Sequence, residues 1–242
     1  MKILAFDTSN QPLSVALFDD DKLIGVRETD IAKNHSEQLL PLIDELMHAQ
    51  NWQPSDLDRV IVSQGPGSYT GLRIAVTTAK TLAFTLGIEL VGISSLALLA
   101  ANVTDEDAII VPLMDARNDN VYSGQYQWQA GQLVNIAPDR HTSISGLPMA
   151  LPPNTQKVIY VGEWTSFETV LQAAVPNASF MQADANKPHA SNALVVAHDA
   201  KVLTAVDDIH QFVPNYLRVT QAEADWQKAH PDARNQDYVE KI

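Results

Sequence analysis

The chain has 242 residues, a formal net charge of −13 from 16 basic and 29 acidic side chains, and no cysteine. The missing cysteine excludes disulfides, thiolate zinc sites and thiol nucleophiles, and it fits a reducing compartment, so we predict a cytoplasmic protein. The negative charge repels polyanions, and a chain of this composition should bind nucleic acid poorly by itself.

The first predicted elements are three short strands at residues 2–6, 14–18 and 22–27, separated by turn-rich stretches. An acid follows the first apolar run, which argues against a signal peptide, and no apolar run of the sequence reaches membrane-spanning length. An amphipathic helix is expected over residues 36–50, because apolar side chains recur there at helical spacing. They include Leu39, Leu42, Ile43 and Leu46.

A strand at residues 60–62 is followed by the glycine-rich turn Gly65-Pro66-Gly67-Ser68-Tyr69-Thr70-Gly71 and by a long helix over residues 70–86. Glycines free the backbone, and a helix N-terminus attracts anions, so the turn has the outline of a phosphate site. Its spacing departs from both common nucleotide-binding fingerprints. A tight strand-to-helix connection is the other interpretation.

The long helix carries one continuous apolar stripe, with two further apolar side chains, Ile74 and Phe84, roughly opposite it. A helix that is apolar on two sides is either enclosed by its own fold or shared with a neighbour. We favour a shared surface and therefore predict a dimer. The stripe includes Leu72, Val76, Ala79, Leu82 and Ala83.

After a polar break at residues 102–107 the same plan begins again. Strands are expected at 109–114 and 121–126, then a strand at 157–162 that leads through a glycine into a helix over 165–174, and a last helix over 191–204. Two lobes on one plan predict an α/β duplication. The predicted domains are residues 1–104 for the N-terminal lobe with the dimerisation helices, 105–226 for the C-terminal lobe, and 227–242 for a polar tail.

Several strings of residues resemble the TsaB (YeaZ) family of bacterial tRNA-modification subunits. In the first lobe they are Ile3-Leu4-Ala5-Phe6-Asp7-Thr8-Ser9, His35-Ser36 with Leu39-Leu40-Pro41, and the glycine turn continued by Leu72-Arg73-Ile74. The second lobe adds shorter matches: Met114-Asp115-Ala116-Arg117 with Val121-Tyr122, and Tyr216-Leu217-Arg218 with Ala222-Glu223 and Trp226.

The resemblance implies an α/β, two-lobed, duplicated actin-like ATPase (ASKHA) fold with mixed sheets and flanking helices. It also implies a pseudo-enzyme that supports the synthesis of threonylcarbamoyladenosine beside the anticodon of tRNAs reading ANN codons. In that system the related TsaD performs the transfer, TsaB is its scaffold in a heterodimer, and TsaE joins the pair. Family members also form homodimers through the two long helices of the first lobe.

These considerations predict a partner-binding surface and no catalytic residue, metal or cofactor in this chain. The seven histidines contain no pair at i and i+4, and residues 93–99, where TsaD-like enzymes carry metal ligands, have none. The partner-binding residues predicted are Leu39, Leu42, Ile43, Leu46, Leu72, Val76, Ala79, Leu82 and Ala83. Possible vestigial phosphate loops are Asp7, Thr8 and Ser9 in one turn and Gly65, Gly67 and Gly71 in the other.

Two enzyme readings remain open beside the scaffold, namely a free-standing actin-like ATPase and a peptidase of the glycoprotease type. An ATPase would need a second acid aimed at a metal from the other lobe, for which Asp115 is a partial candidate. A purely homodimeric interaction module is a third possibility. Because the chain is so acidic, tRNA is expected to be bound only indirectly, mainly through the partner, and no membrane association is predicted.

Overall fold

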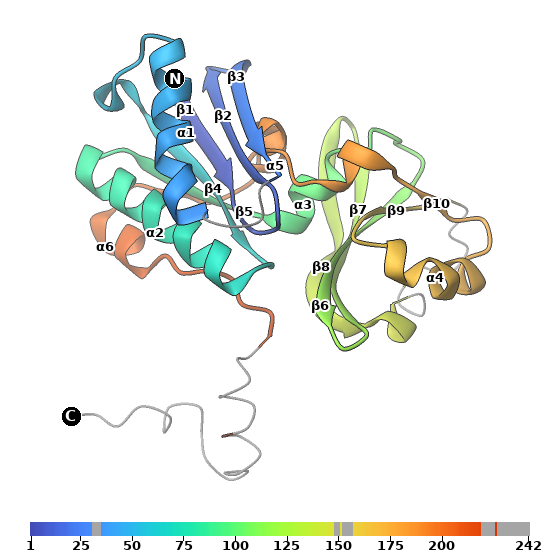
Figure 1. The fold of residues 1–242 in the computed structure, drawn as a ribbon. Helices are drawn as coiled ribbons and strands as arrows, with labels where there is room; N and C mark the ends of the chain where they lie inside the picture. The colour runs from blue at the N-terminus through green and yellow to red at the C-terminus, as the bar shows by residue number, and fades with distance from the viewer. Residues whose placement is uncertain (31–34, 148–150, 152–156, 219–225, 227–242) are drawn as a thin grey trace.

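The computed structural model describes residues 1–30, 35–147, 151, 157–218 and 226. It contains two mixed β-sheets that lie in separate lobes, with helices packed around each (Figure 1). The predicted polar tail at 227–242 lies outside the described residues. Of the helices in the described ranges, none is both long and apolar enough to cross a membrane.

The first sheet has six strands in the order β11-β5-β4-β1-β2-β3. The first three strands in sequence form an antiparallel meander, and the next two add parallel to the first, as their hydrogen-bond register shows. Its central strands are buried almost throughout, because helices cover both faces. The bounds are Lys2–Asp7 (β1), Leu13–Asp19 (β2), Lys22–Thr29 (β3), Arg59–Gly65 (β4), Glu89–Ser94 (β5) and Val202–Leu203 (β11).

The second sheet has five strands in the order β10-β9-β6-β7-β8. Five strands of the first sheet, β5-β4-β1-β2-β3, have the same order and the same antiparallel and parallel pairings, so the second lobe repeats the plan of the first. This confirms the predicted two-lobed, duplicated α/β fold with mixed sheets and flanking helices. The bounds are Ile109–Arg117 (β6), Asn120–Gln129 (β7), Gln132–Ser143 (β8), Val158–Gly162 (β9) and Ser179–Phe180 (β10).

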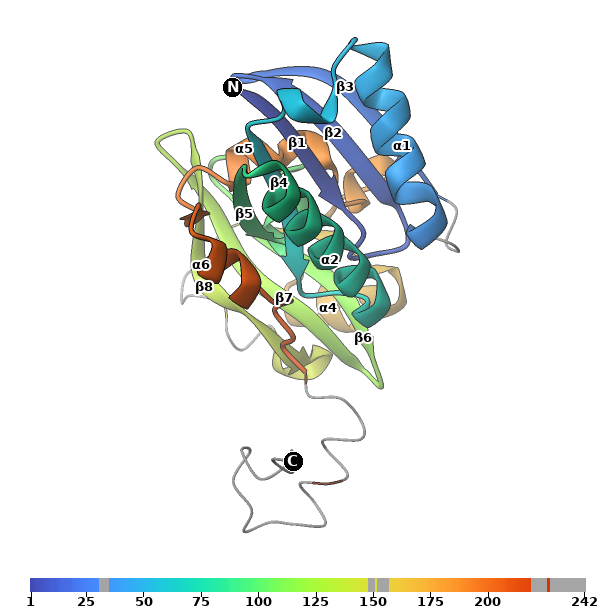
Figure 2. The ribbon, with the colours of Figure 1, turned by 90° about the vertical axis from the view of Figure 1, so that its left-hand side faces the viewer.

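Two long helices, α1 (His35–Ala49) and α2 (Tyr69–Leu86), lie side by side over one face of the first sheet (Figure 2). Their inner side chains join the sheet in one hydrophobic core. The sequence sets both ends of α2, since the Ser68 hydroxyl caps the first turn by accepting from the amide of Gly71, and Gly87 ends the helix in a left-handed conformation.

The other face of the first sheet is covered by shorter helices, which contribute Leu98, Ala190 and Ala193 to a second core. The remaining helices are mostly single turns. They are α3 (Ser95–Ala100), α4 (Glu168–Ala174), α5 (Ala193–Val196), α6 (Val206–Gln211), η1 (Pro54–Asp56), η2 (Ile144–Gly146), η4 (Thr165–Phe167), η5 (Ala183–Asn186) and η6 (Ala190–Asn192).

The helix predicted over residues 191–204 is wrong. Only η6 and α5 are helical there, and the chain then extends so that Val202 pairs with Val91 and Leu203 with Leu90. This pairing closes the edge of the first sheet, and a helix over the same residues could not supply it. Residues assigned to the second lobe by sequence therefore pack on the first, and we propose that the second lobe spans residues 105 to about 182.

A partly buried polar cluster joins the two lobes where β5 ends. Ser94 accepts from the amides of Leu96 and Ala97 at the start of α3 and donates to Asp139 of β8 at 2.5 Å. The Tyr126 hydroxyl of β7 donates to the other Asp139 oxygen, also at 2.5 Å. Burial raises the pKa of Asp139, although both hydroxyls oppose this shift. The carboxylate thus fixes the first lobe to the second at their covalent junction.

Candidate functional site

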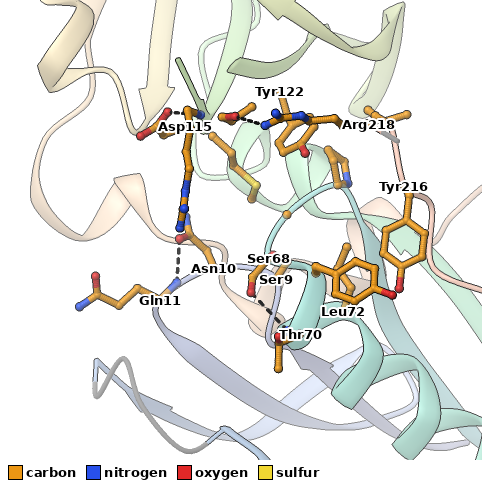
Figure 3. Close-up of a pocket in the computed structure, with 18 of the residues that line it drawn as sticks. Ser9, Asn10, Gln11, Ser68, Thr70, Leu72, Asp115, Tyr122, Tyr216 and Arg218 are labelled. Atoms are coloured by element: carbon orange, nitrogen blue, oxygen red, sulfur yellow. Dashed lines mark hydrogen bonds between the residues drawn. The ribbon is translucent and has the colours of Figure 1, made fainter. Parts of the chain in front are cut away.

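A cavity of about 1190 Å³ lies between the two lobes (Figure 3). Six segments meet there: the β1–β2 turn, the start of α1, the glycine loop with the start of α2, the β6–β7 turn, Glu163 after β9, and residues 215–218. Its lining mixes aromatic rings, hydroxyls and charges of both signs. The titratable side chains on its wall are His35, Tyr69, Asp115, Arg117, Tyr122, Glu163, Tyr216 and Arg218.

The glycine loop packs directly on the β1–β2 turn. The Thr8 hydroxyl donates to the carbonyl of Gly71 at 2.7 Å, and the Ser68 amide donates to the carbonyl of Ser9 at 2.7 Å. A Cβ atom on Gly71 would lie 2.0 Å from the Thr8 carbonyl oxygen, and one on Gly67 would lie 2.3 Å from that of Ser9. These two glycines therefore permit the approach of one backbone to another.

Gly65, the first glycine of the predicted phosphate loops, packs against residue Asn215 and not against the β1–β2 turn. Its φ is +122°, and a Cβ atom there would lie 2.7 Å from the carbonyl oxygen of Asn215. The close approach of that segment of the chain explains why a side chain is absent. The two predicted loops are thus neighbours in the fold, and the backbone of one packs directly against the backbone of the other.

Asp7 and Ser9 are both buried at this junction. Asp7 Oδ2 accepts from the Ser9 amide at 3.2 Å, whereas Asp7 Oδ1 and the Ser9 hydroxyl have no hydrogen-bond partner among the described residues. Burial raises the pKa of Asp7 from 3.8 to about 6, and the neighbouring hydroxyls of Ser63 and Ser9 oppose the shift. A buried carboxyl group with a free oxygen is a feature of functional sites as well as of strained structural ones.

The second lobe faces the cavity with the β6–β7 turn. Asp115, the partial candidate for a second acid, is exposed, and its Oδ1 accepts from the Arg117 amide at 2.7 Å. The Asp115 amide in turn donates to Glu163 at 2.6 Å. The carboxylate of Asp115 is therefore engaged in shaping its own turn.

Residues 212–218 cross the mouth of the cavity from the first lobe to the second. The Asn215 amide donates to the carbonyl of Gln64 at 2.7 Å, and Arg218 donates to the carbonyl of Ala116 at 2.9 Å. Tyr216 stacks on Tyr69 with ring centroids 5.0 Å apart. The residues of this segment resemble a known family, but their sequence predicts no role for them, because nothing local reveals that the segment bridges two lobes.

The structure corrects the choice of side chains for partner binding. Seven of the nine predicted residues lie in the chain's own core, where a partner could not reach them without unfolding the first lobe. Leu42 and Leu82 are partly buried against the same core. The stripe marks the face that packs on the sheet. The seven buried residues are Leu39, Ile43, Leu46, Leu72, Val76, Ala79 and Ala83.

The outer faces of the same helices differ from the stripes. Leu40 on α1 and Phe84 on α2 are 55% and 53% exposed. Other exposed positions of α2 carry the small hydroxyl side chains Thr77 and Thr81, and no residue of α2 is an acid. Large apolar side chains at exposed positions are features of contact surfaces. The use of this helix pair for partner binding stays a prediction, now resting on these residues.

The chain matches the family model described as TsaD, tRNA N6-adenosine threonylcarbamoyltransferase, over residues 19–226. It is 37% identical to the tRNA threonylcarbamoyladenosine biosynthesis protein TsaB of Bacillus subtilis (strain 168), over 93% of this chain and 98% of that protein. The TsaB protein of Escherichia coli (strain K12) is 30% identical over 52% of this chain and 55% of its own length.

A solved structure with a similar fold is YeaZ from Pseudomonas aeruginosa. It superimposes with a TM-score of 0.76 and 28% identity, covering 89% of this chain and 99% of that one. The similarity therefore extends over both lobes.

Proposed function

This chain belongs to the TsaB (YeaZ) family, and we propose that it serves tRNA threonylcarbamoyladenosine biosynthesis in the cytoplasm as a non-catalytic subunit. In this proposal a TsaD subunit carries out the threonylcarbamoyl transfer, and the chain holds TsaD through the outer faces of α1 and α2. TsaE joins the assembled pair. Without TsaD, two copies of the chain pair through the same faces.

The proposal that the chain is non-catalytic is supported mainly by the packing of the two loops against each other. In a phosphate-binding loop the backbone amides point at a ligand. Here Gly71 lies against Thr8 and Gly67 against Ser9, so the space between the loops is taken by the chain's own backbone. The two acids on the cavity wall are also engaged, since Asp115 accepts from the Arg117 amide and Glu163 accepts from the Asp115 amide.

The net charge supports an indirect role toward tRNA. A chain with a formal charge of −13 repels a polyanion at distances up to the Debye length, about 8 Å at physiological salt. We therefore expect that tRNA contacts the partner and that the isolated chain binds tRNA weakly at all salt concentrations.

The test is reconstitution with purified TsaD and TsaE. Threonylcarbamoylation of tRNA should require this chain, and native mass spectrometry should detect conversion of its homodimer to a mixed dimer when TsaD is added. Leu40→Glu with Phe84→Glu should reduce both outcomes. Val170→Glu is the matched control, because Val170 is 44% exposed on α4 in the second lobe. Full modification activity without the chain would refute the proposal.

Asp7 favours a second candidate, an actin-like ATPase. A fully buried carboxyl group with a pKa of about 6 and an unpartnered oxygen beside a cavity is the kind of group that a cation or a water molecule engages in enzymes. If this candidate is right, the purified chain hydrolyses ATP and Asp7→Ala abolishes the activity. The glycoprotease-type alternative has no specific observation in its favour among the described residues.

A further inference from the structure

A further point of contact between the lobes lies on the edge of the first sheet, where the chain returns from the second lobe. Asn186 at the end of η5 is held by the second lobe, since its side chain accepts from the Gly162 amide at 2.8 Å. Four residues later Ala190 is buried against the first sheet, and its amide donates to the hydroxyl of Ser14 on β2 at 2.8 Å. His189 therefore sits where the chain passes between the lobes.

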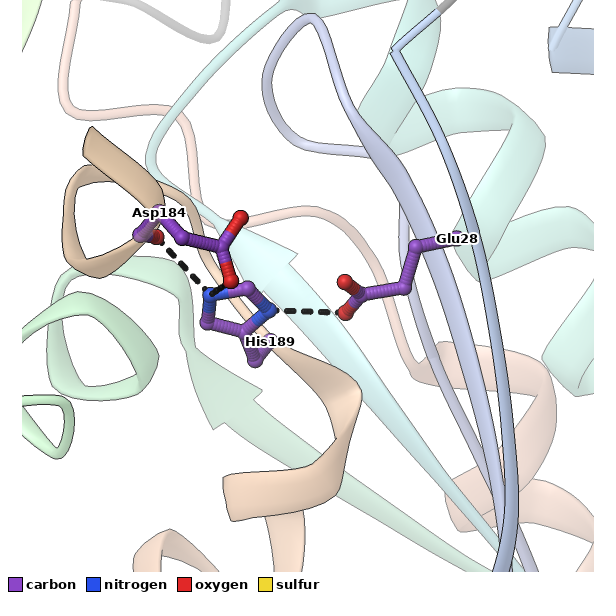
Figure 4. A group of neighbouring side chains, drawn as sticks. All are labelled: Glu28, Asp184 and His189. Atoms are coloured by element: carbon purple, nitrogen blue, oxygen red, sulfur yellow. Dashed lines mark hydrogen bonds and ion pairs between the residues drawn. The ribbon is translucent and has the colours of Figure 1, made fainter.

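Both ring nitrogens of His189 face hydrogen-bond acceptors (Figure 4). Nδ1 lies 2.7 Å from Oε1 of Glu28 on β3, and Nε2 lies 2.9 Å from the backbone carbonyl oxygen of Asp184. A carbonyl oxygen can only accept, and a neutral imidazole has a single N–H. Satisfying both contacts requires protons on both nitrogens, which is the imidazolium cation.

The partner of Nδ1 is an ionised carboxylate. The hydroxyl of Ser14 uses its oxygen to accept from Ala190, so its proton is directed to Glu28 Oε1 at 2.7 Å. One oxygen of Glu28 thus receives hydrogen bonds from both Ser14 and His189. Burial by itself would raise the pKa of Glu28, but these hydrogen bonds outweigh it and hold the pKa below its ordinary value.

The surrounding charges also favour a cation at this position. Asp184 places a carboxylate oxygen 3.5 Å from Nε2, and Lys187 lies between Asp30 at 2.9 Å and Asp184 at 3.3 Å. With Glu28 this makes three carboxylates, and Lys187 is the other cation of the group. The hydrogen bond to Glu28 is the largest effect that raises the pKa of His189, and burial opposes it.

Glu28, Asp184 and His189 each offer one ligand atom, and these atoms lie within 4.8 Å of one another. Both ring nitrogens already contact acceptors, Glu28 Oε1 and the carbonyl oxygen of Asp184, and this arrangement favours two N–H groups over a bound ion (Figure 4). The ammonium group of Lys187 beside Asp184 further opposes a bound cation.

We infer that His189 is a pH-responsive clamp between the lobes, which in its doubly protonated form ties the edge strand β3 to the returning chain and which loosens on deprotonation. The same segment is also bound by Asn102, whose side-chain amide donates to the carbonyl oxygens of Ala185 at 2.8 Å and Lys187 at 2.7 Å. Deprotonation therefore loosens the crossing without unfolding it.

The pH range over which the clamp is closed follows from the directions in which the pKa values of His189 and Glu28 are shifted. The pKa of His189 is raised in the folded chain, so its contribution is complete below its ordinary value of 6.5 and is lost as the pH rises through the higher folded value. The pKa of Glu28 is lowered, so its contribution is complete above its ordinary value of 4.5. The clamp is strongest between these two ordinary values and weakens toward alkaline pH.

The first test is histidine NMR on the full chain, with the His189 signals identified by His189→Gln. We expect two protonated ring nitrogens at pH 6, and a titration midpoint above 6.5 that moves to lower pH in Glu28→Gln. Asp184→Asn, which keeps the backbone carbonyl, should move it less. A single protonated nitrogen at pH 6, or an unchanged midpoint in Glu28→Gln, overturns the inference.

The second test measures the clamp itself by hydrogen exchange of the Ala190 amide, corrected for its intrinsic rate. Protection should fall as the pH passes the His189 midpoint in the parent chain and should lose this dependence in His189→Gln. Protection that does not depend on the midpoint overturns the inference. So does a Zn²⁺ titration in which the ring signals of His189 report metal binding that Glu28→Gln abolishes.

Discussion

At Asp7 the fold keeps a carboxyl group wholly out of solvent, with one oxygen bonded to the Ser9 amide and the other unpartnered. Raising the pKa from 3.8 to about 6 means that the folded chain favours the protonated group. At 1.36 kcal/mol per pKa unit the ionised form costs roughly 3 kcal/mol. Because the shift is upward, this cost is absent below pH 3.8 and complete above pH 6.

Asp7→Asn should therefore stabilise the chain in a pH-dependent way. The amide removes the charge and can still accept from Ser9, so the free energy of unfolding should rise by about 2–3 kcal/mol at pH 8 and by much less at pH 4.5. Urea unfolding at both values measures the difference. Asp21→Asn, at an exposed position, is the control. Equal effects at the two pH values would contradict the buried titration.

Gly71 offers a test of the loop packing at the same scale. Ala has a helix propensity better than Gly by about 1 kcal/mol, so Gly71→Ala would stabilise an isolated helix. In this fold the added Cβ meets the Thr8 carbonyl oxygen, and we expect a net loss of about 1–3 kcal/mol. Gly87→Ala is the matched control: its φ of +69° strains the new side chain, but no atom lies within 4 Å. A larger loss in Gly87→Ala would mean that the loops do not pack as described.

At the scale of elements, helical and strand periodicity predicted most of the first lobe, because buried faces leave a regular pattern in sequence. The same pattern cannot reveal a partner surface. The stripe of α2 is regular because it packs on the sheet. The exposed side chains Thr77, Thr81 and Phe84 also recur at helical spacing, but two of the three are polar, so an apolar pattern does not single them out. The strand β11 was missed for another reason, since two residues become a strand only through pairing with Val91 and Leu90.

A buried and an exposed leucine of α1 should respond differently when each is replaced by glutamate. Leu46→Glu places a charge at a site that is 1% exposed and should destabilise the protomer by several kcal/mol. Leu40→Glu, at 55% exposure, should change protomer stability by no more than about 0.5 kcal/mol and should weaken self-association. Thermal unfolding at low concentration and sedimentation measure the two effects. Unchanged association in Leu40→Glu would exclude that residue from the pairing surface.

At the scale of the whole molecule, the contacts that hold the lobes together include three that sequence could not predict. The cluster around Asp139, the crossing at residues 212–218 and the His189 clamp each join residues far apart in the chain. The duplication itself was predictable, because each lobe repeats a local order of strands and helices. How the lobes face each other depends on these long-range polar contacts, which leave no periodic trace.

Removing the carboxylate of Asp139, which both Ser94 and Tyr126 contact, should weaken the coupling between the lobes. Asp139→Ala removes the acceptor shared by Ser94 and Tyr126 and leaves the buried Tyr126 hydroxyl with only its 3.3 Å contact to Ser94, so we expect a loss of about 2–4 kcal/mol. Tyr126→Phe should cost only about 1 kcal/mol, and the double variant should cost less than the sum. Urea unfolding measures the energies, and hydrogen exchange in each lobe measures the uncoupling. Additive losses would indicate that the two side chains act independently.

The return of β11 to the first sheet has a consequence for protein synthesis. When the ribosome has made β1 to β5, the open side of β5 still lacks its neighbour, which is not translated until residue 203. Throughout translation of the second lobe the nascent chain exposes an unpaired strand edge, a template for wrong pairing. Premature termination before β11 should therefore yield aggregating fragments, and the N-terminal half should depend on chaperones until its last strand emerges.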